Sequence, residues 1–224
     1  MNRKKVSVII PCAGHNKKKG IYGAKSLIQL SNNEYLLERQ IRLVKQQYGN
    51  PEIIVVTGFQ SDKIIPILPK KVKVAENESY ENTSVVRSID IGLKVASYED
   101  VVIIYGDTIF NSFGLPKVEK NSTIIIDSQG QMKDDEIGLN MIDKRAVYFS
   151  YGFRPKWANI LYISKDDIGE FRKLISAKES KKLFTFEILN KMIDMGYYIQ
   201  CIEPKNMKIA KIDTPKDIEV ARLI

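Results

Sequence analysis

The sequence is poor in the side chains that build covalent or metal-based catalytic centres. It has 224 residues, with two cysteines and one histidine. Cys12 and Cys201 are too few for a disulfide framework or a cysteine-based zinc site, and they indicate a reducing, intracellular setting. With His15 alone, a Ser-His-Asp triad or a multi-histidine metal site is hard to build. We therefore expect oxygen ligands for any metal, which favours magnesium or manganese.

Long apolar runs and two common phosphate-binding motifs are also missing. No run of about 18 apolar residues is present, so we expect no transmembrane helix. The basic start at residues 2–5 lacks a signal-peptide cleavage pattern, and we predict a cytoplasmic protein that binds no membrane. The absence of G-x-x-x-x-G-K-[ST] excludes a P-loop NTPase. The absence of G-x-G-x-x-G argues against a nicotinamide or flavin enzyme.

Positive charge is in excess, with a formal net charge of +8 and a pI of about 9.2. Such a balance attracts polyanions, including nucleic acids, anionic membranes and phosphorylated metabolites, although a solvated lysine surface explains it equally well. A nucleic-acid-binding protein also needs a recognition helix or an aromatic and basic face. The sequence offers neither, so we predict no nucleic-acid partner and keep that class as an alternative.

Hydrophobic periodicity predicts alternating strands and helices in the first half of the chain. The strands are expected at residues 6–10, 52–57, 72–75 and 101–105. The helices are expected at 35–46, at 60–68 and after Thr83, which we expect as a helix cap. This alternation favours an α/β fold with a parallel, doubly wound sheet. The second half predicts strands at 123–127, 136–142, 147–151, 158–164, 198–202 and 208–212, and helices at 167–175, at 183–195 and after Thr214.

The loop after the first strand is a candidate phosphate site. It contains Gly14, and Lys17, Lys18, Lys19 and Lys25 concentrate positive charge in or beside it. Open α/β sheets bind ligands at the carboxyl ends of their strands. Gly14 allows the backbone to approach a phosphate, to which loop amides donate. A mobile basic loop is the alternative explanation.

Two aspartates each follow a predicted strand. Asp107 follows residues 101–105 and Gly106, and Asp213 precedes Thr214-Pro215. Either could serve only a turn or a helix cap. Together they suit magnesium, which proteins hold with one or two carboxylates plus substrate phosphates.

Several segments match, in order and spacing, a known family. Ile10-Pro11-Cys12-Ala13-Gly14, Ala24-Lys25-Ser26-Leu27 and Leu36-Leu37-Glu38-Arg39-Gln40-Ile41 resemble the opening of sugar-nucleotide pyrophosphorylases and small-molecule cytidylyltransferases. Tyr105-Gly106-Asp107-Thr108-Ile109-Phe110 resembles their G-D motif. Ile212-Asp213-Thr214-Pro215-Lys216-Asp217-Ile218 resembles their closing I-D-T-P-E-D-L. The resemblance is closest to phosphocholine-type cytidylyltransferases.

The resemblance implies a fold and a domain plan. It implies the nucleotide-diphospho-sugar transferase fold, a three-layer, Rossmann-like α/β arrangement in which helices flank a mixed, mainly parallel sheet. Residues 1–224 would form one domain, with a nucleotide-binding half at about 1–115 and an acceptor-binding half at about 116–224.

The resemblance also implies residue roles. Lys25, Asp107 and Asp213 would be catalytic, and the two aspartates would hold Mg²⁺. The nucleotide would contact Pro11, Ala13, Gly14, Lys25, Asn82, Thr83 and Gly106. The acceptor would contact Arg154, Lys156, Glu187 and Asn190, whereas we interpret Trp157 as a packing residue. One departure is that His15-Asn16-Lys17-Lys18-Lys19 follows Gly14 where the family has G-x-G-x-R, so the fork of an arginine is missing.

The expected reaction is transfer of CMP from CTP to a small phosphorylated metabolite, with release of pyrophosphate. The acceptor could be phosphocholine, a phosphonate or a sugar phosphate, and a homo-oligomer stays open. One alternative is a sugar-1-phosphate nucleotidyltransferase that uses UTP, dTTP or GTP. Another is a glycosyltransferase, against which the Gly-Asp-Thr strand end argues because that class often carries D-x-D.

Overall fold

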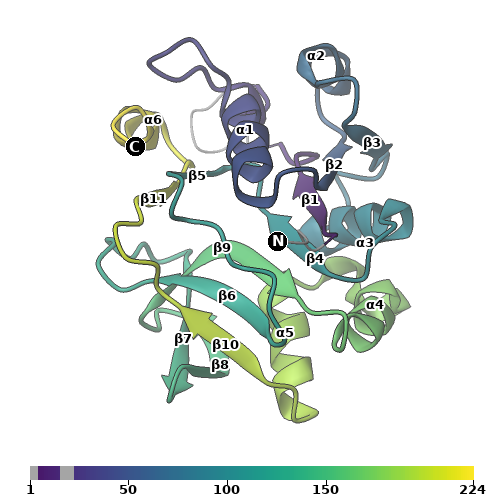
Figure 1. The fold of residues 1–224 in the computed structure, drawn as a ribbon, viewed down its shortest axis with the longest axis vertical. Helices are drawn as coiled ribbons and strands as arrows, with labels where there is room; N and C mark the ends of the chain where they lie inside the picture. Colours follow the sequence, from purple (N-terminus) through teal and green to yellow (C-terminus); the bar gives the residue numbers. More distant parts are fainter. Residues whose placement is uncertain (1–4, 16–22) are drawn as a thin grey trace.

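The computed structural model describes residues 5–15 and 23–224. The strands of its main sheet are β1 (Ser7–Pro11), β2 (Glu52–Thr57), β3 (Lys73–Glu76), β4 (Val101–Ile104), β6 (Ser122–Asp127), β7 (Ile137–Ile142), β8 (Arg145–Tyr151), β9 (Lys156–Ile163) and β10 (Ile199–Ile202). In the described residues they form one sheet in the order β3-β2-β1-β4-β9-β6-β10-β8-β7 (Figure 1). The sheet therefore runs without a break through both halves of the chain.

Helices cover both faces of this sheet (Figure 1). They are α1 (Leu36–Tyr48), α2 (Ser61–Ile64), α3 (Val85–Val95), α4 (Ile168–Ser176), α5 (Thr185–Asp194) and α6 (Pro215–Ala221), with short 3₁₀ turns η2 (Lys25–Leu27), η3 (Ile65–Ile67) and η4 (Lys178–Lys182). None of the helices in the described part of the chain is long and apolar enough to cross a membrane.

The strands β3, β2, β1 and β4 are parallel, and β2, β1 and β4 are buried, whereas β3 is a largely exposed edge strand. Alternate residues of β1 serve opposite faces: Ile9 packs with Ile89 of α3, and Ile10 packs with Ile41 of α1. Gly92 lets α3 approach closely, because a Cβ there would lie 2.6 Å from a methyl carbon of Ile9. This close packing fixes the strands whose carboxyl ends carry the site.

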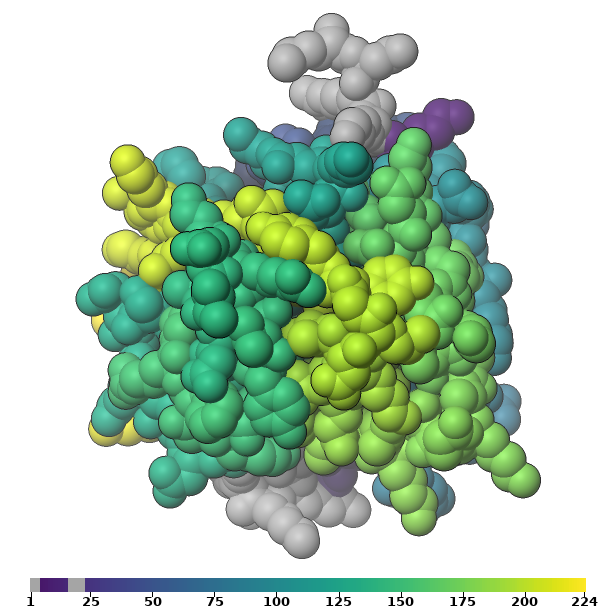
Figure 2. Space-filling view, turned by 90° about the horizontal axis from the view of Figure 1, so that it is seen from below, coloured from purple at the N-terminus to yellow at the C-terminus, as the bar shows by residue number. Residues whose placement is uncertain are grey.

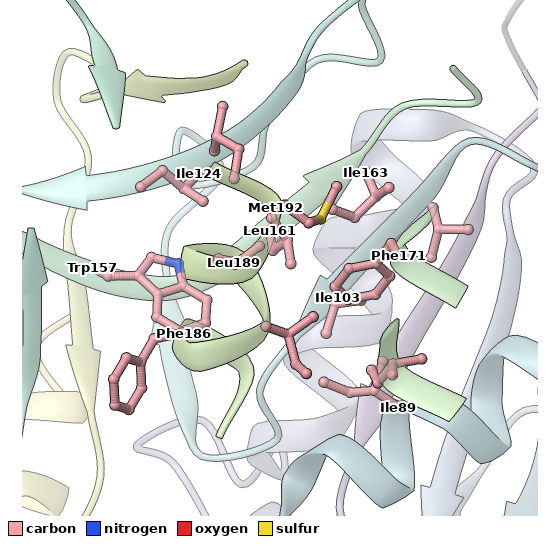
Figure 3. Close-up of a cluster of buried hydrophobic side chains, with 14 of the residues drawn as sticks. Ile89, Ile103, Ile124, Trp157, Leu161, Ile163, Phe171, Phe186, Leu189 and Met192 are labelled. Carbon is pink, nitrogen blue, oxygen red and sulfur yellow. The ribbon is translucent and has the colours of Figure 1, made fainter. Parts of the chain in front are cut away.

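The larger core cluster lies between the sheet and α3, α4 and α5. Figure 3 shows Ile103 of β4 and Leu161 of β9 against Phe171 of α4 and Leu189 and Met192 of α5. All five side chains are fully buried or nearly so. Burying a side chain of this size contributes about 1.5–3 kcal/mol, so this layer anchors the second half of the chain to the first.

The second half of the chain changes the sheet from parallel to antiparallel. Strand β9 is antiparallel to β4 and β6, and β7 and β8 form an antiparallel hairpin, whereas β10 is parallel to β6. The turn at Asp143 and Lys144 imposes the antiparallel pairing of β7 with β8, because a tight turn joins only antiparallel strands. In Figure 2 this half forms the visible face, with the yellow-green segment after α5 crossing between the teal β6–β8 region and the light-green helices.

A second, two-stranded sheet joins the C-terminal segment to the first half of the chain. It pairs β5 (Thr108–Phe110) with β11 (Ile209–Lys211) in antiparallel register. Ile109 and Ile212 are buried together with Leu36 of α1. This pairing brings the residues after β11 back to the carboxyl end of β4.

The α/β fold class and its flanking helices are confirmed, with two local differences from the sequence predictions. Strand β5 was not predicted. Ser84, rather than Thr83, caps α3: its Oγ accepts a hydrogen bond from Val86 N at 3.2 Å. Thr83 Oγ1 instead donates to Ser79 O at 2.9 Å, which places Thr83 one residue too early to cap the helix.

Candidate active site

A cavity of about 460 Å³ opens at the carboxyl ends of β1 and β4. We divide the lining into three parts and name each one after the role that the sequence resemblance leads us to expect there. The nucleotide end is Ala13, Gly14, His15, Asn77, Tyr80, Thr83 and Ser88. The metal end is Lys25, Asp107, Lys211 and Asp213. The acceptor end is Asp135, Glu136, Tyr151, Trp157, Phe184 and Phe186.

At the metal end, one ammonium group joins the two aspartates that the sequence singled out. Lys25 Nζ lies 3.0 Å from Asp107 Oδ2 and 2.6 Å from Asp213 Oδ1. Lys211 Nζ lies 2.7 Å from Asp213 Oδ2. The structure thus gathers Lys25, Asp107 and Asp213 from three distant parts of the sequence and adds Lys211.

The proximity of these charges changes their acidity. Burial alone would raise the pKa of the Asp213 carboxyl, but Lys211 and Lys25 outweigh it and hold that pKa far below its ordinary value. Burial alone would lower the pKa of the Lys211 ammonium, but Asp107 and Asp213 outweigh it, and the pKa is raised. Asp213 is therefore anionic and Lys211 cationic at neutral pH.

The backbone holds the two aspartates in place. Gly106 N donates to Pro11 O at 3.2 Å, and a Cβ on Gly106 would lie 2.6 Å from Cys12 Sγ and 2.8 Å from Pro11 O. Only glycine fits this approach between the ends of β1 and β4. On the other side, Ile212 N donates to Asp107 O at 2.9 Å, so the end of β11 is tied directly to the residue after Gly106.

The donor set at the metal end suits magnesium shared with a polyphosphate. Asp107 Oδ1 is buried and has no hydrogen-bond partner among the described residues, so it is available to a cation. Those residues contain no group of three or more His, Cys, Asp or Glu side chains able to hold a metal. Two carboxylates plus substrate phosphates is a common arrangement for magnesium.

The nucleotide end combines backbone groups with a polar network. Asn77 Nδ2 donates to Thr83 Oγ1 at 3.2 Å and to Ser88 Oγ at 3.0 Å. The rings of His15 and Phe59 have centroids 3.9 Å apart, and Phe59 N donates to Ala13 O at 3.1 Å.

The predicted nucleotide residues fall into three groups in the structure. Pro11, Ala13, Gly14, Lys25, Thr83 and Gly106 line the cavity. Asn82 is exposed and does not line it. The lysine run Lys17-Lys18-Lys19 lies outside the described residues.

The acceptor end is aromatic and acidic. Tyr151 and Phe186 meet edge to face with centroids 5.6 Å apart, and Phe184 stacks on Phe186 at 6.1 Å. Trp157 contacts Tyr105 at 5.7 Å, and Figure 3 shows Trp157 and Phe186 together at one end of the core cluster. No Lys or Arg from the described chain lines this end, which instead carries two acidic residues.

Strand β9 is distorted where it borders the cavity. Asn159 has a positive φ of 57°, which is uncommon for a residue inside a strand. The register of β9 against β6 shifts at the same place, and Trp157 Nε1 donates to Ile160 O at 3.1 Å. Asn159 itself lines the cavity. Such bulges are frequent beside functional sites because they redirect side chains.

The four predicted acceptor residues lie outside the cavity lining. Arg154 is exposed. Lys156 Nζ lies 3.4 Å from Glu136 Oε1 and 3.8 Å from Asp127 Oδ2, so its charge is already paired beneath the acceptor end.

The other two predicted acceptor residues satisfy backbone groups. Glu187 accepts from Phe184 N at 2.7 Å, as part of the turn that starts α5. Asn190 is buried, and its amide accepts from Phe149 N at 2.8 Å and donates to Phe149 O at 2.9 Å.

Lys211 and the aromatic side chains of the cavity were not predicted from the sequence. Lys211 stands two residues before Asp213, and alternation along β11 was a signal that both side chains point to the same side. Trp157 was interpreted as packing, and it is 3% exposed and belongs to the core, but it also lines the cavity. Phe184 and Phe186 are at the start of α5, where no sequence motif marked them.

Cys12 lines the cavity but is no nucleophile. Burial, with a smaller contribution from the negative charge of Asp107, raises its thiol pKa to about 12. A thiol attacks as the thiolate, which is scarce at neutral pH when the pKa is this high.

No family model and no curated protein matches the sequence, whereas solved structures match over nearly the whole chain. The CTP:phosphocholine cytidylyltransferase of Streptococcus pneumoniae is 17% identical, with a TM-score of 0.80 over 97% of this chain and 98% of that one. The inositol-1-phosphate CTP transferase of T. maritima is 17% identical, with a TM-score of 0.75 over 97% and 94%. HddC from Yersinia pseudotuberculosis, complexed with GMP-PN, is 17% identical, with a TM-score of 0.71 over 97% and 98%.

This chain has the nucleotide-diphospho-sugar transferase fold. The similarity covers both the parallel first half and the antiparallel second half, so the fold implied by the sequence resemblance is confirmed.

Proposed function

We propose that this protein is a nucleotidyltransferase that transfers CMP from CTP to a small phosphorylated acceptor. The observation that carries the proposal is the meeting of Lys25 with Asp107 and Asp213, at 3.0 and 2.6 Å, in a cavity at the carboxyl ends of the parallel strands. An open α/β sheet binds nucleotides at this position. The choice of CTP is supported by the sequence resemblance and by the names of the first two similar structures.

The reaction proposed is an in-line displacement. A phosphate oxygen of the acceptor forms a bond to the α-phosphorus of CTP, and the bond from that phosphorus to the bridging oxygen breaks, which releases pyrophosphate. Lys25 and Lys211 offset negative charge on the phosphates, and the backbone at Ala13 and Gly14 holds the nucleotide. Positioning and charge neutralisation suffice for phosphoryl transfer, so no covalent intermediate is required.

Magnesium would be held by Asp107 and Asp213. When bound, it would neutralise phosphate charge and orient the triphosphate. Lys25 now contacts both carboxylates, so we propose that it exchanges these contacts for a phosphate oxygen when the nucleotide binds. Exchange of one ionic partner for another avoids leaving a buried charge unpaired, which would cost several kcal/mol.

For the acceptor, we propose a phosphate ester with a methylated ammonium head group. At the acceptor end, Asp127 and Glu136 share one lysine, Lys156, while Asp135 also lines the cavity and interacts electrostatically with Lys211. Aromatic rings supply the remaining surface. Aromatic faces and carboxylates attract a desolvated cation such as a quaternary ammonium group. Phosphocholine, named in the Streptococcus pneumoniae structure, has this chemistry.

The test of nucleotidyl transfer is a pyrophosphate-release assay with each of four NTPs, magnesium and a panel of acceptors. The panel contains phosphocholine, its uncharged analogue 3,3-dimethylbutyl phosphate, and glucose 1-phosphate. We expect turnover with CTP and phosphocholine and at least about tenfold lower kcat/KM with the uncharged analogue.

Three other outcomes of this assay would contradict the proposed substrates or the proposed reaction. Turnover of glucose 1-phosphate with UTP, dTTP or GTP would replace the proposed substrates by those of a sugar nucleotidyltransferase. Sugar transfer from a sugar nucleotide without pyrophosphate release would identify a glycosyltransferase. Absence of turnover with every NTP would overturn nucleotidyl transfer.

A further inference from the structure

The loop between β6 and β7, residues 128–136, carries the acidic part of the acceptor end. Asp135 and Glu136 line the cavity. The base of the loop is fixed by Asp127, whose Oδ1 accepts from Gln129 N at 3.1 Å and from Gly130 N at 2.8 Å. The position of the end of the loop that precedes β7 determines where Asp135 and Glu136 lie relative to a bound acceptor.

Lys133 and Glu136 form a closed turn within this loop. Lys133 N donates to Glu136 Oε2 at 2.9 Å, and Glu136 N donates to Lys133 O at 3.0 Å. A shift of the Lys133 backbone therefore moves Glu136 directly. Asp135, between the two, would move with them.

The side chain of Lys133 reaches a different part of the chain. Lys133 Nζ lies 2.7 Å from Asp217 Oδ1, across 84 positions of sequence. Asp217 is only 14% exposed and Lys133 is 37% exposed, so the ion pair is partly shielded from solvent. Burial alone would raise the pKa of Asp217, but Lys133 and the local hydrogen bonds outweigh it and lower that pKa.

The other oxygen of Asp217 holds the turn that carries Asp213. Asp217 Oδ2 accepts from Asp213 N at 2.9 Å and from Thr214 N at 2.8 Å. One carboxylate thus connects the Asp213 turn, at the metal end, with the Lys133–Glu136 turn, at the acceptor end. The segment around β11 lies beside the β6–β7 loop in Figure 1, in agreement with this contact.

We propose that Lys133 is a positioning residue for the acceptor: its ion pair with Asp217 holds loop 128–136 against the Asp213 turn. This inference rests on the proposed function and adds to it a residue that touches no substrate. The ion pair sets the distance between the acidic head-group site and the metal end. It therefore affects how the acceptor phosphate is presented to the nucleotide.

The test compares Lys133→Gln, Lys133→Arg and the control Lys117→Gln, which removes an exposed lysine elsewhere in the second half. We expect Lys133→Gln to raise the acceptor KM about fivefold, with the NTP KM within about twofold of the unsubstituted protein. Lys133→Arg keeps the ion pair and should restore the acceptor KM. An unchanged acceptor KM, or an equal rise in both KM values, would overturn the proposal.

Hydrogen exchange provides a second measurement that needs no turnover. In Lys133→Gln the amides of residues 128–136 should exchange faster than in the unsubstituted protein, and those of α3 should not. If the exchange rates of residues 128–136 are unchanged in Lys133→Gln, the ion pair does not hold the loop and the proposal is wrong. If the unsubstituted protein turns over no NTP, the proposed function fails, and the exchange result still decides whether Lys133 holds the loop.

Discussion

At the metal end of the cavity Lys25 and Lys211 contact Asp107 and Asp213, whereas at the acceptor end the lysine is withdrawn beneath the surface. Lys156 is paired with Asp127 and Glu136 outside the cavity lining. The exposed surface there consists of aromatic rings and acidic groups. Two ends of one cavity therefore hold a similar set of charges in different arrangements.

The difference indicates two modes of recognition. At the metal end, opposite charges are placed where an incoming phosphate and cation could exchange partners with them, so we expect electrostatic binding that favours a polyphosphate. At the acceptor end, aromatic rings and acidic side chains define the shape and the negative potential of the surface, so we expect the head group of the acceptor to decide whether it binds. Substitutions at the two ends should therefore separate chemistry from acceptor choice.

The largest expected effect is that of Asp107→Asn. The amide keeps the shape of the carboxylate but removes the negative charge that would bind magnesium and that now contacts Lys25. Loss of one electrostatic stabiliser of a transition state costs about 100- to 1,000-fold in kcat. Steady-state pyrophosphate release measures the loss. Asp62→Asn in α2, an exposed aspartate, is the matched control and should keep full activity.

An Asp107→Asn enzyme that retained more than about a tenth of the normal kcat would contradict the role of this carboxylate. Asp213 and the two lysines would then be sufficient for catalysis without the Asp107 carboxylate.

The next effect is that of Lys211→Gln, which removes one of the two cations at the metal end. A hydrogen bond to a charged group contributes about 1.5–3 kcal/mol, so we expect about a 10- to 100-fold fall in kcat/KM for the NTP. Because its pKa is raised, Lys211 stays charged at every pH below its ordinary value of about 10.4, and its titration should not limit activity at pH 6–9.

The variant to compare with Lys211→Gln is Lys156→Gln, which removes a lysine at the acceptor end. Lys156 lies outside the cavity lining, so the NTP KM should stay within about twofold. The check is to measure kcat/KM for the NTP in both variants over pH 6–9. An equal fall in kcat/KM for the NTP in both would contradict the distinction between the two ends.

The sequence grouped Lys25, Asp107 and Asp213, which the structure brings into contact, whereas their binding of a metal stays a prediction. Lys25 follows the first strand and its loop, and Asp107 and Asp213 follow later strands. The carboxyl ends of the parallel strands β1 and β4 meet at one edge of the main sheet, which explains why Asp107 lies near the first loop. Asp213 instead follows β11 of the separate antiparallel sheet, so its place beside Asp107 was implied by the family resemblance and not by parallel-strand geometry.

The acceptor end could not be predicted in the same way because its residues depend on antiparallel register. Trp157 lies on the same face of β9 as Leu161 and Ile163 and belongs to the core, and only the structure shows that it also borders the cavity. The sequence resemblance implied that Asn190 and Lys156 contact the acceptor. In the structure, Asn190 satisfies the backbone of Phe149, and Lys156 pairs with carboxylates that are distant in sequence.

The smallest expected effect is that of Phe184→Leu, which tests the aromatic part of the acceptor end. Phe184 is 50% exposed, so its loss should hardly affect stability. A cation–π contact at an exposed site contributes about 0.5–1 kcal/mol, so the KM for phosphocholine should rise about two- to fivefold. The KM for 3,3-dimethylbutyl phosphate should change less, because that compound carries no positive charge. Phe113→Leu, at another exposed phenylalanine, is the control, and equal changes for the two acceptors would contradict recognition of the cation.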